Sequence, residues 1–308
     1  MSLLVVGSVA FDSVTSPFGH VEEAVGGSAT FFSTAASYFT RVHLVAVVGD
    51  DFPEAELDDL RQRGVDLSGL TRAVGRTFRW KGEYGADLNE ARTLDTQLNV
   101  FETFNPELPD NCKDCRYVFL ANIDPDLQLR VLDQVRAPRL IGMDTMNFWI
   151  DGPKRPSLMK VLERVDMLFV NDAEARSLSG ESNIVKAARA IQRMGPKRVA
   201  IKRGEYGALI FDEQEHIFYA PAYPLEDVYD PTGAGDSFAG GFMGYLARQD
   251  DLTTATLSQA AIAGSVMASY VVERFSLERL RELNPDLIQA RVRQFRALTD
   301  FRPLAPLA

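Results

Sequence analysis

The sequence is poor in the residues that form disulfides or bind transition metals. Its 308 residues include only two cysteines, Cys112 and Cys115, and three histidines. The histidines (His20, His43 and His216) lie far apart and show no metal-ligand spacing. The two cysteines, in the stretch CKDC, are compatible with a redox pair or half of a metal site, but two reduced thiols are the favoured interpretation.

Clusters of positive charge are also lacking. The formal net charge is -10, and no stretch is rich in lysine and arginine. This argues against nucleic acid or an anionic membrane surface as a partner. An acidic protein that binds anions must use a few local basic groups, main-chain N–H groups or a metal ion. We therefore expect a small-molecule partner, with neither nucleic acid nor membrane.

Neither a signal peptide nor a membrane span is apparent. The opening residues, MSLLVVGSVAF, have no positively charged region and no small-residue cleavage site, and they predict a strand. The longest uncharged stretch, 252–272, is rich in Thr, Ser, Gln and Gly and predicts a pair of buried helices. Together with the few cysteines, these features favour a cytoplasmic location.

Short apolar runs alternate with helical patterns along the chain. Segments 28–39 and 125–135 place apolar residues at helical spacing, 206–223 predicts a hairpin, and the chain after 230 is nearly all helical. Strands that are apolar on both faces and alternate with helices predict a doubly wound, mostly parallel α/β sheet within one domain over 1–308. The predicted strands are 3–7, 42–49, 117–121, 139–144, 167–171 and 198–204.

Two segments break this rhythm. Residues 77–85 and 96–104 alternate apolar and polar side chains, which predicts antiparallel strands of a half-exposed sheet. With 12–25 they predict a small β-sheet lid, built from about 12–25 and 75–105. The lid's aromatic side chains need cover from the main domain or a partner subunit, so we expect a homodimer through the lid. These aromatic residues are Phe78, Trp80, Phe101 and Phe104.

The stretch DPTGAGDSFAGGF, residues 230–242, joins a glycine turn, a carboxylate and the start of a helix. The small residues 233–235 leave main-chain N–H groups unobstructed at the helix N-terminus, an arrangement that suits an anion. The same field favours an ionised Asp236, which could accept a proton from a hydroxyl while the turn holds a phosphoryl group. The plainer interpretation is a helix cap. Further glycines cost the helix up to ~1 kcal/mol each and predict close backbone packing. They are Gly240, Gly241 and Gly244.

This stretch resembles the C-terminal signature of the ribokinase-like, or PfkB, family of carbohydrate and nucleoside kinases. The resemblance implies that Asp236 is the catalytic base. It places Asp230 and Thr232 where many members bind a monovalent cation, so K⁺ is a candidate ligand. It also implies that the anion hole for the γ-phosphate of ATP is formed by Gly233, Ala234 and Gly235.

Two other stretches resemble the nucleotide side of the family. Asn171 and Glu174 reproduce its N-x-x-E pattern, which implies a role in holding Mg²⁺ through water; without that context they predict a helix cap. Lys202, Gly204 and Gly207 reproduce its K-x-G-x-x-G pattern, which implies a position beneath ATP. Alone, such glycine spacing is a simple strand-to-hairpin turn.

The N-terminal region resembles the family's substrate side. Asp12, at the end of GSVAFD, is implied to bind substrate hydroxyls, and Gly26 and Gly27 match the hinge between lid and core. Phe31 stands where many members carry a substrate-binding asparagine. With Phe11, it favours an acceptor that has an apolar or aromatic part, such as a nucleoside. The alternative is that both phenylalanines pack the first helix.

The sequence thus predicts an ATP- and Mg²⁺-dependent kinase that phosphorylates an alcohol group of a small carbohydrate. A nucleoside or a sugar phosphate is the alternative acceptor within the family. A catalytically idle sensor of sugars or nucleotides is the alternative from another class, although a pure binder needs no base at Asp236. A dinucleotide-dependent dehydrogenase is disfavoured because GSVAFD, after the first strand, is not G-x-G-x-x-G.

Overall fold

A nine-stranded sheet forms the centre of the protein in the computed structural model, which describes residues 2–85, 87–89 and 91–300. Its strands are β1 (Ser2–Val6), β4 (Arg41–Val48), β5 (Val65–Arg72), β8 (Tyr117–Leu120), β9 (Leu140–Asp144), β10 (Met167–Asn171), β11 (Arg198–Lys202), β12 (Ala208–Phe211) and β13 (Ile217–Ala220). Their order across the sheet is β13-β12-β11-β10-β9-β8-β1-β4-β5. All neighbours from β11 to β5 run parallel, whereas β12 and β13 are antiparallel additions at one edge.

The six apolar runs of the sequence correspond to β1, β4, β8, β9, β10 and β11, which confirms the predicted α/β class. These strands are buried along nearly their whole length. Parallel strands need cover on both faces, so they cannot tolerate alternating polar residues. The predicted hairpin is also present, as β12 and β13.

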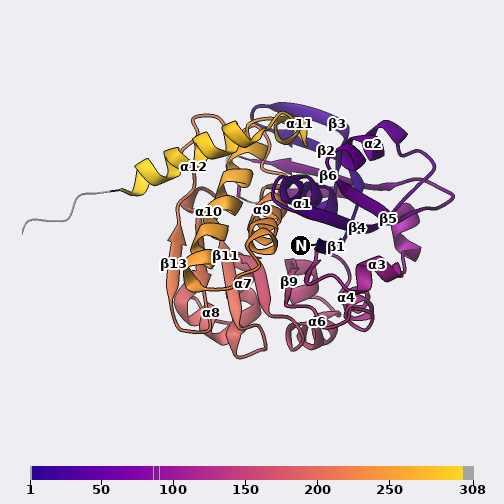
Figure 1. Ribbon diagram of the computed structural model, residues 1–308. Helices are drawn as coiled ribbons and strands as arrows, with labels where there is room; N and C mark the ends of the chain where they lie inside the picture. The colour runs from indigo at the N-terminus through magenta and orange to yellow at the C-terminus, as the bar shows by residue number, and fades with distance from the viewer. Residues whose placement is uncertain (1, 86, 90, 301–308) are drawn as a thin grey trace, which may run out of the picture.

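Helices cover both faces of this sheet (Figure 1). The first core contains apolar side chains of α1 (Ser28–Ser37), α2 (Glu54–Gln62), α9 (Ala234–Gln249) and α10 (Thr254–Val271). The second core contains those of α3 (Asp110–Lys113), α4 (Pro125–Leu132), α5 (Asn147–Ile150), α6 (Arg155–Leu162), α7 (Asp172–Ser179) and α8 (Ile184–Gln192). The remaining helices are α11 (Glu278–Arg281), α12 (Pro285–Thr299) and the short 3-10 helices η1 (Asn99–Thr103) and η2 (Gly204–Tyr206).

Glycines bring α9 into backbone contact with its neighbours. A Cβ atom placed on Gly240 would lie 2.4 Å from the main-chain oxygen of Phe32 in α1. One placed on Gly241 would lie 2.8 Å from the main-chain oxygen of Ala263 in α10. The predicted close packing of this helix is therefore confirmed, and it holds the helix that starts at the glycine turn rigidly against the core.

A second, four-stranded sheet in the order β3-β2-β6-β7 lies at the top of the view in Figure 1. It consists of β2 (Ala10–Ser16), β3 (Gly19–Gly26), β6 (Phe78–Tyr84) and β7 (Ala91–Gln97). β2 and β3 pair antiparallel, as do β6 and β7, but β2 and β6 pair parallel. The expected strand over 96–104 is wrong, because residues 99–103 form η1.

Aromatic stacking explains this error. Phe101 in η1 stacks between Phe78 and Phe104, with ring centroids 5.5 and 5.4 Å apart. Phe104 is buried in the second core. Phe78, Phe101 and Phe104 are therefore covered by one another and by the second core. They do not by themselves require a partner subunit, and the homodimer through the lid stays a prediction.

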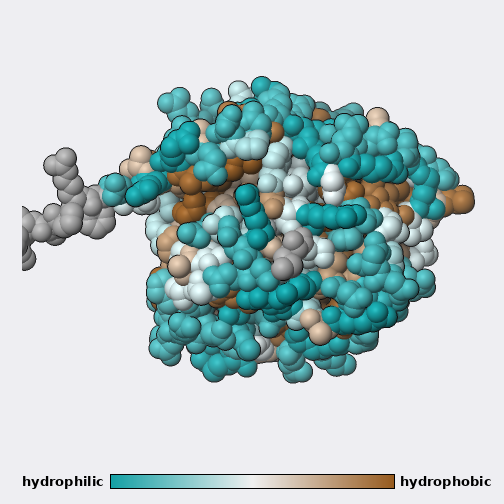
Figure 2. Space-filling view, in the orientation of Figure 1, coloured by the Kyte–Doolittle hydropathy of each residue, from teal (hydrophilic) through white to brown (hydrophobic). Residues whose placement is uncertain are grey.

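Other sequence expectations have simple structural outcomes. The uncharged stretch 252–272 contains the single helix α10 rather than a helix pair, and it is largely buried. Among the described residues, no helix combines the length and apolar character needed to cross a bilayer. Most of the face shown in Figure 2 is hydrophilic, and apolar residues gather beneath α12 and beside β5. Cys112 and Cys115 are free and buried, and burial raises the pKa of Cys112 to about 12, so neither is a reactive thiolate at neutral pH.

We expect Gly240→Ala to lower the free energy of unfolding by roughly 1–3 kcal/mol, because the added methyl group overlaps the backbone of α1. This loss outweighs the ~1 kcal/mol that alanine contributes in a helix. Denaturant unfolding of both proteins measures the difference. Gly85→Ala is the control, because nothing lies within 4 Å of a Cβ atom at that position. An increase in stability for Gly240→Ala would contradict the packing described here.

Candidate active site

The glycine turn between β13 and α9 has a backbone that only glycine adopts easily. Gly233, which precedes α9, has φ 76°, in the left-handed region. A Cβ atom there would lie 2.4 Å from the ring of Phe31. Phe31 is 2% exposed, so it supports the turn from below. Phe31 therefore packs against the turn, as the alternative interpretation has it, and its contact with a substrate stays a prediction.

One of the three N–H groups predicted to form the anion hole already has a partner in the structure. The N–H of Ala234 donates to the main-chain oxygen of Pro231 at 3.1 Å, so it closes the turn and does not face outward. The main-chain N–H groups of Gly233 and Gly235 remain as the candidate donors in this turn. The helix dipole still favours negative charge at this position.

Asp236 lies in the first turn of α9 and is partly buried. Its pKa is raised to about 7, first by burial and then by the negative charge of Asp144, while the ammonium group of Lys202 opposes both. The helix dipole favours the ionised carboxylate, but desolvation has the larger effect on the pKa of Asp236. A pKa near neutrality suits a general base.

An ion pair that the sequence analysis missed lies beside the turn. Lys202 Nζ, at the end of β11, donates to Asp144 Oδ2, at the end of β9, at 2.8 Å. A Cβ atom on Gly235 would lie 2.8 Å from Lys202 Nζ, so this glycine leaves room for the ammonium group. The available signal was positional: both residues end predicted parallel strands, whose carboxyl ends share one edge of the sheet.

Asn171 and Glu174 form a reciprocal helix cap at the start of α7. The N–H of Glu174 donates to Asn171 Oδ1 at 2.7 Å, and the N–H of Asn171 donates to Glu174 Oε2 at 2.8 Å. Burial raises the pKa of Glu174 to about 7, with Asp144 adding to the shift. The cap thus explains the spacing of the two residues and also holds a second carboxyl group near Asp144 and Lys202.

The other glycines of the nucleotide-side motif shape the connection between β11 and β12. Gly204 and Gly207 have φ 52° and 76°. A Cβ atom on Gly207 would lie 2.1 Å from the main-chain oxygen of Ala220 in β13. One on Gly204 would overlap Asn89 Oδ1, which lies in the connection between β6 and β7. The small sheet therefore reaches this loop.

Asp12 faces the turn from the small sheet. The N–H of Gly27 donates to Asp12 Oδ2 at 3.2 Å, and a Cβ atom on Gly26 would lie 1.9 Å from the same oxygen. The two glycines therefore make room for this carboxyl group. Burial raises the pKa of Asp12 to about 7. Asp12 also raises the pKa of Asp236, so the two belong to one site although 224 positions separate them.

Asp230 braces the segment that precedes the turn. It is 1% exposed, and its two carboxylate oxygens accept the main-chain N–H groups of Thr232 at 2.9 Å and Ser276 at 3.0 Å. The hydroxyl of Thr232 donates to that of Tyr84 at 3.2 Å. Tyr84, the last residue of β6, is a second site residue that sequence reasoning missed.

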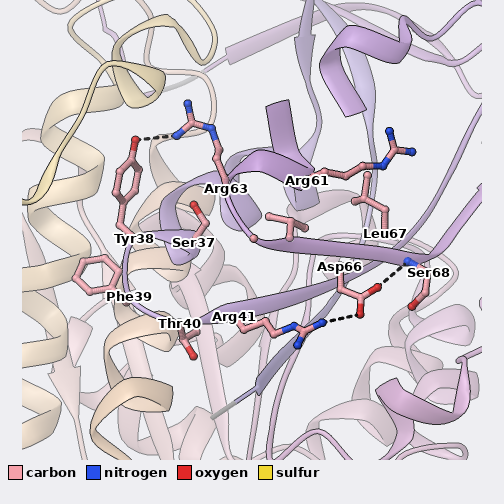
Figure 3. A pocket seen from close by; sticks show the side chains of 12 residues that line it. Ser37, Tyr38, Phe39, Thr40, Arg41, Arg61, Arg63, Asp66, Leu67 and Ser68 are labelled. Carbon is pink, nitrogen blue, oxygen red and sulfur yellow. Dashed lines mark hydrogen bonds and ion pairs between the residues drawn. The ribbon is translucent and has the colours of Figure 1, made fainter. Parts of the chain in front are cut away.

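A separate depression of about 860 Å³ lies at the opposite edge of the sheet, at the start of β4 and β5 (Figure 3). Its arginines already have partners: Arg41 pairs with Asp66, and Arg63 donates to the hydroxyl of Tyr38. The acidic and basic groups at the carboxyl ends of the strands are therefore the better candidate for chemistry.

Comparison with known proteins agrees with this geometry. Residues 3–281 match the pfkB family of carbohydrate kinases. The chain belongs to this family. It is therefore a kinase, and its relatives include sugar kinases and nucleoside kinases.

Individual relatives show the range of the family. The chain is 30% identical to a cytidine kinase of Thermococcus kodakarensis, covering 80% of this chain and 89% of that protein. It is 27% identical to a nucleoside kinase of Methanothermobacter thermautotrophicus, covering 98% and 97%. A putative ribokinase II of E. coli, solved with ATP and Mg²⁺, shares the fold with a TM-score of 0.77 at 20% identity, covering 95% and 99%.

Because Asp236 has a pKa near 7 in this PfkB fold but 3.8 as a free side chain, its burial costs stability as the pH rises between these values. Asp236→Asn should therefore be more stable than wild type at pH 8, by about 1–2 kcal/mol after allowance for partial exposure. The gain should vanish near pH 4. Denaturant unfolding across this pH range measures it.

The control is Asp227→Asn, which changes an exposed loop residue. It should show no such pH-dependent gain. A loss of stability in Asp236→Asn at pH 8 would mean that the site stabilises the ionised carboxylate, contrary to the environment described above.

Proposed function

We propose that the protein transfers the γ-phosphate of ATP to a hydroxyl group of a nucleoside, with Asp236 as the general base. The observation that carries this proposal is that Asp236 lies close enough to Asp12 and to both members of the Lys202–Asp144 ion pair for their charges to act on its pKa. This arrangement offers a proton acceptor, a group that orients hydroxyls and a fixed cation beside one turn.

The role of each group follows from its chemistry. Asp12, buried and held by Gly27, accepts hydrogen bonds from substrate hydroxyls and orients the reacting one. Asp236 takes the proton of that hydroxyl while the hydroxyl oxygen attacks the γ-phosphorus, the bond from phosphorus to the bridging oxygen breaks, and ADP leaves. In this proposal, the N–H groups of Gly233 and Gly235 and the ammonium group of Lys202 stabilise the negative charge that develops on the transferred group.

The nucleotide side fits ATP and Mg²⁺. When bound, Mg-ATP supplies the phosphoryl group and neutralises part of its charge. Among the described residues, no group of three or more His, Cys, Asp or Glu side chains is placed to hold a metal ion. In this proposal, phosphate oxygens and water therefore supply most of the Mg²⁺ ligands. Glu174, capped on Asn171 and close to Asp144, suits a role in binding the water shell of a metal that also contacts phosphate oxygens.

The proposed K⁺ site finds less support. Asp230 is buried and uses both carboxylate oxygens for main-chain N–H groups, which assigns it to bracing the turn. Thr232 uses its hydroxyl for Tyr84. Activation by K⁺ stays a prediction, and no step of the proposed reaction depends on it.

The choice of a nucleoside over a free sugar rests on the relatives, since cytidine kinase and nucleoside kinase match most of this chain. The apolar pocket inferred from Phe11 and Phe31 does not support it. Phe11 is covered by the guanidinium group of Arg79 and by the ring of Phe52, and Phe31 lies beneath the turn. Both phenylalanines therefore pack against other residues of the fold.

The decisive experiment measures ADP release from Mg-ATP with nucleosides, free sugars, sugar phosphates and sugar acids as acceptors. We expect turnover with nucleosides, at least tenfold above the other classes in kcat/KM. Asp236→Asn should lose roughly 10²–10⁴-fold in kcat while still binding ATP. Faster turnover on another class would replace the nucleoside. ATP binding without turnover on any class would favour the sensor, and full activity of Asp236→Asn would refute the role of the base.

The pH dependence of kcat/KM tests the same site. Since Asp236 and Asp12 both have pKa values raised to about 7, and act on one another, kcat/KM should fall as the pH drops below about 7. The lysine partner stays protonated throughout this range, because Asp144 and Glu174 raise the pKa of Lys202. A rate that stays flat down to pH 5 would contradict the assignment of a buried carboxyl group as the base.

A further inference from the structure

Tyr84 brings the end of the small sheet into the catalytic site. Burial raises the pKa of its hydroxyl, and the carboxyl groups of Asp230, Asp12 and Asp236 raise it further. The phenol is therefore protonated at neutral pH. It lies close to Asp12, which we propose binds the acceptor, to Asp236, the proposed base, and to Asp230, which holds the turn. Its hydroxyl accepts the hydrogen bond of Thr232, which directly precedes the glycine turn.

The restraints on the glycine turn come from two parts of the protein. The main domain contributes the bonds between Asp230 and the N–H groups of Thr232 and Ser276, and the ring of Phe31 beneath Gly233. The contact from Tyr84 comes from the small sheet. Because glycine permits many backbone conformations, the geometry of such a turn depends on the contacts that hold it.

The same hairpin also contacts the nucleotide-side loop. Asn89, in the connection from β6 to β7, lies directly over the α-carbon of Gly204. The N–H of Asn89 donates to Asp87 Oδ1 at 2.9 Å, which stiffens this connection. Thus one hairpin end meets the catalytic turn through Tyr84 and the loop after β11 through Asn89. The position of this hairpin therefore bears on both the catalytic turn and the loop after β11.

We propose that Tyr84 is a positioning residue that ties the small sheet to the catalytic turn through Thr232, so that the turn reaches its reactive geometry only when the β6–β7 hairpin is seated. This role rests on the proposed reaction at Asp236. It acts on the transfer step, because the contact orients the turn that precedes Asp236. An enzyme built in this way transfers phosphate efficiently only after the small sheet has closed over the acceptor.

The test uses Tyr84→Phe, which keeps the ring and removes the hydroxyl, and Thr232→Val, which removes its partner. Each should lower kcat by roughly 5- to 10-fold, the effect of one lost hydrogen bond, while KM for ATP changes less than about twofold. The double variant should lose no more than the worse single variant, because both remove one interaction. ATP binding by calorimetry and thermal unfolding establish that each variant is folded and loaded.

Tyr219→Phe is the matched control, since it makes the same change at an exposed tyrosine in β13. It should behave like wild type. The role is overturned if Tyr84→Phe keeps kcat within about twofold of wild type, or if the losses of the two single variants multiply in the double variant. An inactive wild type would instead overturn the proposed function and this role with it, so the two failures are distinguishable.

Discussion

The ion pair between Lys202 and Asp144 is the interaction on which the rest of the site depends. It places one ammonium group among the carboxyl groups of Asp144, Glu174 and Asp236, so negative groups outnumber positive ones. Burial and mutual repulsion therefore raise the pKa values of Asp236 and Glu174 towards neutrality. The ion pair also accounts for the glycine at position 235, because a side chain there would displace the ammonium group of Lys202.

Around this pair, the protein combines rigid and adjustable parts. The packing of α9 against α1 and α10 through glycines fixes the helix that carries Asp236. The turn in front of that helix is held by polar contacts and by the ring of Phe31. The small sheet supplies Asp12 and Tyr84 from a separate group of strands.

Membership of the PfkB family establishes the type of reaction more firmly than the acceptor. The groups that we propose handle phosphate lie at the ends of β9, β10 and β11 and in the glycine turn. The proposed acceptor side consists of the small sheet and the loops around Asp12, where fold similarity at 20% identity carries no residue-level information. Phe11 and Phe31 illustrate this point, because both turned out to be packed within the fold.

The sequence by itself determined the strands of the main sheet except β5, and the glycine turn, because buried parallel strands and glycine turns leave local patterns. It also predicted Asp236 and Asp12 as site residues. It misread 96–104, since stacked aromatic residues in a 3-10 helix mimic the alternation of a strand. Only the tertiary structure decided the Lys202–Asp144 pair, 58 positions apart, and the Tyr84–Thr232 contact, 148 apart. Such contacts depend on strand order and on how the two sheets pack, which no local pattern encodes.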